Sequence, residues 1–166
     1  MNQIIVSALN PKFKSFEKPL KRVVRILLKA FPRLKNLQVE VYLVGYETIK
    51  KNVLAFPAPK NFIRPDLKGL KLLGEIYLNP DYIRNEKLEM RNEKKLNYMV
   101  IHGFLHLLGY GHKNISDTII MQNKEQELLN KLRFVTMTIT VVIVVYHRHY
   151  NYATAHRWAR YWLPKH

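Results

Sequence analysis

The chain of 166 residues contains no cysteine. Disulfide bonds, thiolate metal sites and cysteine nucleophiles are therefore excluded together, and histidine is left as the plausible soft metal ligand. A protein without disulfides fits a reducing compartment, so we expect a cytoplasmic location.

Acidic residues are scarce, because 12 Asp and Glu stand against 28 Lys and Arg, for a formal net charge of +16. No acidic residue follows Glu127. Such an excess of positive charge favours a polyanionic partner, and RNA, DNA or an anionic membrane surface would each be attracted. Composition does not choose among them, and a solvated basic surface without a partner is the remaining alternative.

Long hydrophobic runs are also missing. The apolar run within Met1–Leu9 is short and has no basic segment before it, so we expect no secretory signal and a mature chain that starts at Met1. The β-branched run over residues 134–146 has about 13 residues, against the ~20 that a membrane-spanning helix needs. We therefore expect no transmembrane span, and predict a strand, a surface-covering segment or an irregular appendage there.

The rest of the C-terminal segment, residues 133–166, is basic and aromatic. Basic residues interleaved with aromatic ones can stack on bases and pair with phosphates, or lie at a membrane interface. A disordered tail without a selected role is the alternative. We treat this segment as a tail outside the main domain, 1–132.

Hydrophobic periodicity predicts an α/β (α+β) domain with a small mixed sheet and helices packed on it. Short or alternating apolar runs predict four strands: Gln3–Ala8, Leu37–Val44, Asn52–Phe56 and Gly74–Leu78. Helical spacing predicts three helices: Phe16–Phe31, Glu93–Leu108 and Ser116–Leu132. We expect Leu37–Val44 to bury one side only. In the last helix, Ser116 is the expected N-cap, and Ile119 and Ile120 are expected to belong to its apolar stripe.

Three histidines stand in the motif His102-Gly-Phe-Leu-His106-Leu-Leu-Gly-Tyr-Gly-His112. On a helix, His102 and His106 project from one face, and Gly109 can turn the chain so that His112 becomes a third ligand. Three imidazoles predict a site for one zinc ion, although nickel, cobalt or copper would also fit. The fourth position stays open for water, whose pKa zinc lowers toward neutrality, and this indicates a hydrolase.

The histidine spacing also matches the zinc-binding frame of the metzincin proteases, in which a glutamate follows the first histidine as general base. Gly103 occupies that position here. Without a carboxylate beside the activated water, a peptidase lacks its proton acceptor, so a metallopeptidase is the weakest hypothesis.

The same motif resembles the signature of the YbeY family, bacterial zinc-dependent endoribonucleases that mature ribosomal RNA. Three more segments agree: Asn52-Val-Leu-Ala-Phe-Pro57 resembles a strand ending in Ser-Phe-Pro, Leu73-Gly-Glu-Ile76 resembles Leu-Gly-Asp-Ile, and Met121 with the glutamates after it resembles the last helix. The resemblance covers roughly Gln3 to Leu132.

The resemblance implies a zinc ion held by His102, His106 and His112 in a basic cleft, where the three histidines act in catalysis through a metal-activated water. The implied activity is cleavage of single-stranded RNA in late 3′ processing of the small-subunit rRNA and in ribosome quality control, in the cytoplasm. Ribosomal RNA is the implied partner, ribosomal proteins are further candidates, and DNA is not expected.

The sequence departs from the family pattern at several positions. Gly111 replaces an aspartate, Ala55 replaces a serine, and the short segment 44–52 leaves no counterpart for an arginine thought to meet RNA. Lys50 and Lys51 are the candidate phosphate contacts in its place, although lysine lacks the planar two-bond fork of arginine. A second hypothesis is therefore a non-catalytic, zinc-containing RNA- or ribosome-binding protein that has lost activity.

Overall fold

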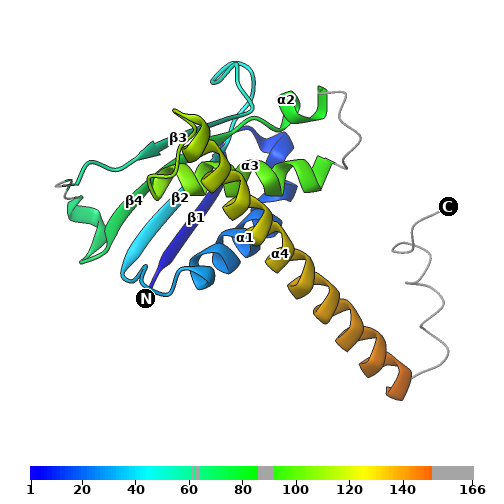
Figure 1. Ribbon diagram of the computed structural model, residues 1–166. Coiled ribbons are helices and arrows are strands. Elements are labelled where there is room, and N and C mark those ends of the chain that lie inside the picture. Colours follow the sequence, from blue (N-terminus) through cyan, green and yellow to red (C-terminus); the bar gives the residue numbers. More distant parts are fainter. Residues whose placement is uncertain (61, 63, 86–91, 151–166) are drawn as a thin grey trace. The chain divides into compact units, whose positions relative to one another are not determined.

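The computed structural model describes the backbone of residues 1–60, 62, 64–85 and 92–150, and the side chains of these residues except 83–85, 92–93 and 134–150 (Figure 1). The chain divides into two units, Met1–Leu129 and Asn130–His166. The first unit contains the sheet and the histidine motif. The proposed role of the tail in binding falls mostly on residues outside the described ranges and stays a prediction.

A four-stranded mixed sheet forms the centre of the first unit (Figure 1). The strands are β1 (Gln3–Ala8), β2 (Leu37–Leu43), β3 (Val53–Pro57) and β4 (Lys71–Leu78). Their order is β1-β2-β4-β3, with β1, β2 and β4 parallel and β3 antiparallel to β4. All four predicted strands are confirmed, and so is the predicted mixed α+β fold.

The three predicted helices are present as α1 (Glu17–Ala30), α3 (Asn92–Leu107) and α4 (Ile115–Tyr150). The structure adds three short helical segments: η1 (Pro11–Phe16), η2 (Pro65–Leu67) and α2 (Pro80–Asn85). Within the described ranges, no helix has both the length and the apolar character that a membrane span requires.

Helices α1 and α3 lie on the same face of the sheet, where α1 packs against β1 and α3 packs against β3 and β4 (Figure 1). The approach of α3 is close at Gly103, where an added Cβ atom would lie 2.9 Å from Ile76 Cγ2 and 3.3 Å from Val53 Cγ2. The side of α3 that carries Gly103 therefore faces the sheet, and any side chain at this position would force Ile76 or Val53 to shift.

The prediction that β2 buries one side only is wrong. Glu40, on its other side, is 2% exposed and forms an ion pair with Arg64, whose Nη1 lies 2.7 Å from Glu40 Oε1. Gln38 and the hydroxyl of Tyr42 also donate hydrogen bonds to the Glu40 carboxylate. Strand periodicity could not reveal this, because Arg64 comes from the distant β3–β4 loop.

Replacing Arg64 with alanine should lower the free energy of unfolding by about 2 kcal/mol. Glu40 would keep its bonds from Gln38 and Tyr42 but lose the one cation that the described residues place beside it, and a buried carboxylate left without its partner is costly. The effect falls below the 3–5 kcal/mol of a fully buried pair because the Arg64 side chain is 27% exposed. Urea unfolding followed by circular dichroism measures it. Asp66→Asn, which removes the exposed partner of Arg64, is the control and should leave stability nearly unchanged.

Helix α4 differs from its prediction in three respects. Its N-cap is Asn114, whose side chain accepts a hydrogen bond from the Asp117 backbone, so the prediction of Ser116 is wrong. Ile119 and Ile120 are 52% and 57% exposed, so neither belongs to the buried stripe. The strand alternative for residues 134–146 is also wrong, because the backbone stays helical to Tyr150. No glycine or proline interrupts α4, and β-branched residues disfavour an established helix only weakly.

Candidate metal centre

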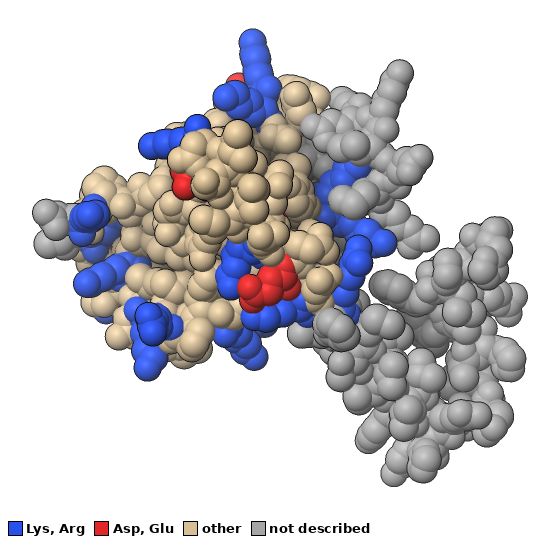
Figure 2. Space-filling model, in the orientation of Figure 1, with Lys and Arg blue, Asp and Glu red and all other residues tan. Residues whose placement is uncertain are grey.

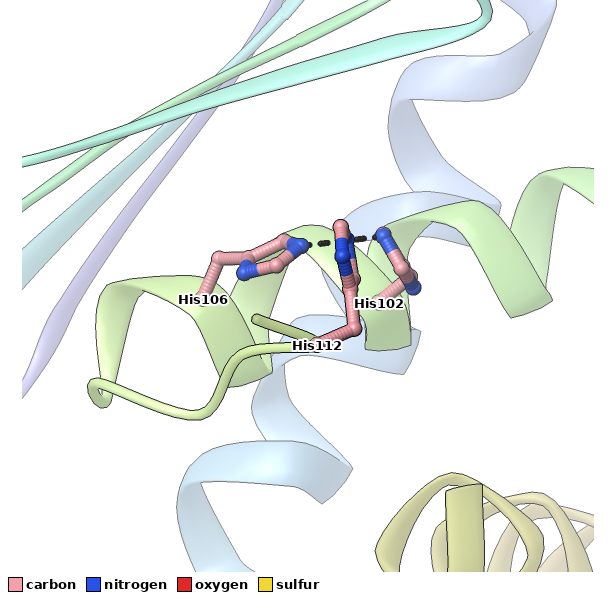
Figure 3. Close-up of side chains that lie close together, drawn as sticks. All are labelled: His102, His106 and His112. Atoms are coloured by element: carbon pink, nitrogen blue, oxygen red, sulfur yellow. Dashed lines mark hydrogen bonds between the residues drawn. The ribbon is translucent and has the colours of Figure 1, made fainter. Parts of the chain in front are cut away.

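Helix α3 presents His102 and His106 from successive turns, and the loop after it returns His112 to the same point (Figure 3). One nitrogen from each imidazole lies within 4.8 Å of the other two. The turn depends on Gly109, whose φ of 89° lies in the left-handed region that favours glycine. The structure therefore brings the three predicted ligands together by the local route that the motif indicates.

Hydrogen bonds orient two of the three rings. His102 Nδ1 lies 2.7 Å from Glu125 Oε1, and His106 Nδ1 lies 2.9 Å from the backbone oxygen of Tyr110. A carboxylate and a carbonyl oxygen are acceptors, so each Nδ1 donates, and in a neutral ring this tautomer leaves the lone pair on Nε2.

These two Nε2 atoms face each other at 3.0 Å. A shared cation would remove the repulsion between two lone pairs at that distance, and the separation allows both nitrogens to reach one ion at the roughly 2.0–2.1 Å typical of zinc. Burial and the nearby His102 lower the pKa of His106, which favours the neutral form that a metal ligand needs. The donor set therefore fits a metal ion.

Glu125 is a site residue that the sequence analysis missed. It is 4% exposed, and its second oxygen accepts a hydrogen bond from the Tyr98 hydroxyl at 2.8 Å. Burial alone raises the pKa of Glu125, but the hydrogen bonds from His102 and Tyr98 outweigh it, so the pKa lies below its usual value. Burial and the bond to Glu125 raise the pKa of Tyr98 to about 12.

The sequence did contain a signal for Glu125. Met121, Glu125 and Leu128 recur at helical spacing, and all three are buried. A carboxylate in the buried stripe of a helix requires a hydrogen-bonding or charged partner. The sequence does not indicate which residue that partner is. The contact of Glu125 with His102 is of the same kind as the carboxylate–histidine pairs that orient metal-binding imidazoles.

Changing Glu125 to glutamine should weaken metal binding by about 10- to 100-fold, because the amide lacks the charge that orients and polarises His102. Competition with a chromophoric chelator measures the affinity without reference to catalysis. Glu127→Gln is the matched control, since Glu127 lies on the same helix and pairs with Lys124 at its surface. Equal metal affinities of the two variants would show that Glu125 does not assist metal binding by His102.

A cleft of about 720 Å³ adjoins the histidines. His106 and His112 line it together with Lys113 and Asp117, so it offers a cation and a carboxylate beside the metal ligands. Gly111 also lines the cleft, and a Cβ atom added there would meet nothing within 4 Å. The position at which the family pattern has aspartate is therefore open space, whereas Asp117 brings a carboxylate from α4.

Lys50 and Lys51 are exposed in the loop that precedes β3. Neither is among the residues that line the cleft. The structure thus assembles the three histidines but does not place these two lysines beside them, and their role as phosphate contacts stays a prediction.

Comparison with known proteins agrees with this site. The family model described as Endoribonuclease YbeY matches residues 5–133. Three relatives, each named Endoribonuclease YbeY, illustrate the similarity. The chain is 40% identical to that of Neorickettsia sennetsu over 83 residues, which are 49% of this chain and 54% of the relative. It is 32% identical to that of Clostridium beijerinckii over 109 residues, covering 64% and 59%. It is 25% identical to that of Thermoanaerobacter sp. over 140 residues, covering 71% and 88%.

The chain thus spans little more than half the length of the first two of these relatives. The family match nevertheless includes the sheet except the first two residues of β1, together with α3 and all three histidines. By this match, the chain belongs to the Endoribonuclease YbeY family.

Proposed function

We propose that this protein is a zinc-dependent endoribonuclease that cuts single-stranded RNA. The observation that carries the proposal is the convergence of three imidazoles, two of them oriented by hydrogen bonds through Nδ1, in a chain of this family. The net charge of +16 supports RNA as the substrate.

The three histidines and two charged residues of the cleft have roles in this proposal. His102, His106 and His112 hold the zinc ion, which supplies a Lewis acid and an activated water at neutral pH. Lys113 neutralises charge on the phosphate to be cut, and the Asp117 carboxylate accepts a proton. Lys50 and Lys51 remain candidates for contacts with phosphates farther along the strand.

The biological setting is part of the proposal. The family name supports an RNA substrate, and we assign the chain to late 3′ processing of the small-subunit rRNA and to ribosome quality control. Ribosomal RNA and ribosomal proteins are then its partners, and DNA is not. The lack of cysteine supports a cytoplasmic location.

A second function has one observation in its favour. Gly111 leaves the cleft without the carboxylate of the family pattern, so the chain is also a candidate for a non-catalytic, zinc-containing RNA- or ribosome-binding protein. No such observation supports a metallopeptidase. Gly103 faces Ile76 and Val53, so a general base at this position would not lie beside the metal.

Removal of the metal distinguishes the two main candidates. Zinc-loaded protein should cut an rRNA fragment with single-stranded ends, and chelator-treated protein should not, until zinc is added back. Sequencing of the products locates the cuts. Tight binding without cutting under any metal would instead support the non-catalytic protein.

A further inference from the structure

Helix α1 turns a uniformly basic face to solvent. Its exposed charged residues recur at helical spacing: Lys18, Lys21, Arg22, Arg25 and Lys29. We name these five residues the α1 basic face. The opposite side of the helix is buried in the core: Leu20, Val23, Val24, Leu27 and Leu28. The one acidic residue of α1, Glu17, accepts a hydrogen bond from the Ala8 backbone of β1.

The positive charge of this face is uncompensated. Among the described residues, no carboxylate forms an ion pair with any member of the α1 basic face. Like charges three or four residues apart on a helix destabilise it by about 0.2–0.5 kcal/mol a pair. Lys18 with Arg22, Lys21 with Arg25, and Arg25 with Lys29 are such pairs. A polyanion bound along the face would turn this repulsion into attraction.

The C-terminal end of α1 adjoins the two helices that carry His102, His106 and Glu125. Phe31, which follows α1, packs against Phe104 of α3 with 5.9 Å between ring centroids. The Lys124 ammonium of α4 lies 5.2 Å from the centre of the Phe31 ring. Blue side chains lie along the lower edge of the molecule in Figure 2, where Figure 1 shows α1.

We infer that the α1 basic face binds the phosphate backbone of the RNA and holds it while a single-stranded end enters the cleft. The inference rests on the proposed function for the identity of the polymer. From Lys18 to Lys29 the face extends about 16 Å at 1.5 Å per residue, long enough to meet several successive phosphates of one strand.

A membrane surface fits this helix less well than RNA does. A helix that lies on a bilayer buries its apolar side among lipids, and basic residues flank that side. The apolar side of α1 is already buried against the sheet, at Leu20, Val24 and Leu27. What remains outside is charge alone, which suits a backbone of phosphates.

The test compares two triple variants with the same loss of three positive charges. Arg22→Gln/Arg25→Gln/Lys29→Gln changes the α1 basic face, and Lys60→Gln/Lys68→Gln/Lys71→Gln changes exposed lysines near β4. Binding of the full chain to a labelled, structured rRNA fragment is measured over a series of salt concentrations. We expect the α1 variant to lose affinity on the order of 10- to 100-fold, and its salt slope to fall by roughly 2–3, while the control stays near the unchanged protein.

Equal losses in both variants, or none in either, would overturn the inference. So would unchanged RNA binding with lost binding to vesicles of anionic phospholipid, which would assign the face to a membrane. Cleavage of a short single-stranded oligonucleotide separates this inference from the proposed function. If neither the unchanged protein nor either variant cuts this oligonucleotide, the proposed nuclease activity is refuted. A selective loss of rRNA binding in the α1 variant would still support the α1 basic face.

Discussion

Replacing His106 with alanine should abolish metal binding and RNA cleavage together. His106 is the central residue of the proposed site, since its Nε2 lies 3.0 Å from His102 Nε2 and its ring centroid lies 5.1 Å from that of His112. Two imidazoles without the third hold a metal ion poorly, and the activated water is lost with it. We expect cleavage to fall by roughly 1000-fold or more, which corresponds to about 4 kcal/mol of transition-state stabilisation.

The experiment needs both readouts on one preparation. Bound metal is measured by inductively coupled plasma mass spectrometry, and cleavage on an end-labelled rRNA fragment. Zinc should raise the thermal unfolding temperature of the unchanged protein but not that of the variant, since only a protein that binds the metal gains stability from it. Circular dichroism without metal should be the same for both. Persistent cleavage by the metal-free variant would mean that another site or a contaminating nuclease cuts the RNA.

Replacing Gly103 with glutamate should unfold the protein instead of creating a peptidase. An added Cβ atom would already lie 2.9 Å from Ile76 Cγ2, and the carboxylate beyond it would be buried against apolar side chains of the sheet. Overpacking of a core costs about 1–3 kcal/mol, and a buried, unpaired charge costs several more. A loss of about 5 kcal/mol or more approaches the whole stability of many domains.

Gly103→Ala is the graded control for this prediction. It adds only the Cβ atom, and the better helix propensity of alanine offsets part of the strain, so we expect a loss of about 1–2 kcal/mol. Urea unfolding measures both variants. A folded glutamate variant of unchanged stability would show that α3 does not approach the sheet here, and peptidase activity in that variant would revive the metzincin comparison.

The sequence alone was enough for features that depend on local geometry. Helical spacing puts His102 and His106 on one face, and Gly109 permits the turn that returns His112, so the convergence of the three histidines could be predicted without the fold. The strands and α3 followed for the same reason, because a period of two or of 3.6 residues is a property of neighbouring positions. The resemblance in the motif was confirmed by the family match.

The tertiary structure alone decided which distant residues meet. Glu125 lies 23 positions from His102, and Arg64 lies 24 from Glu40, so no local period connects either pair. Ile119 looked like a core residue by its spacing but is exposed, because the side of α4 that packs is the one carrying Met121, Glu125 and Leu128. The hydrophobic pattern indicates only that a helix has an apolar side. Which side is buried, and which charge is neutralised there, depends on the surface that it packs against.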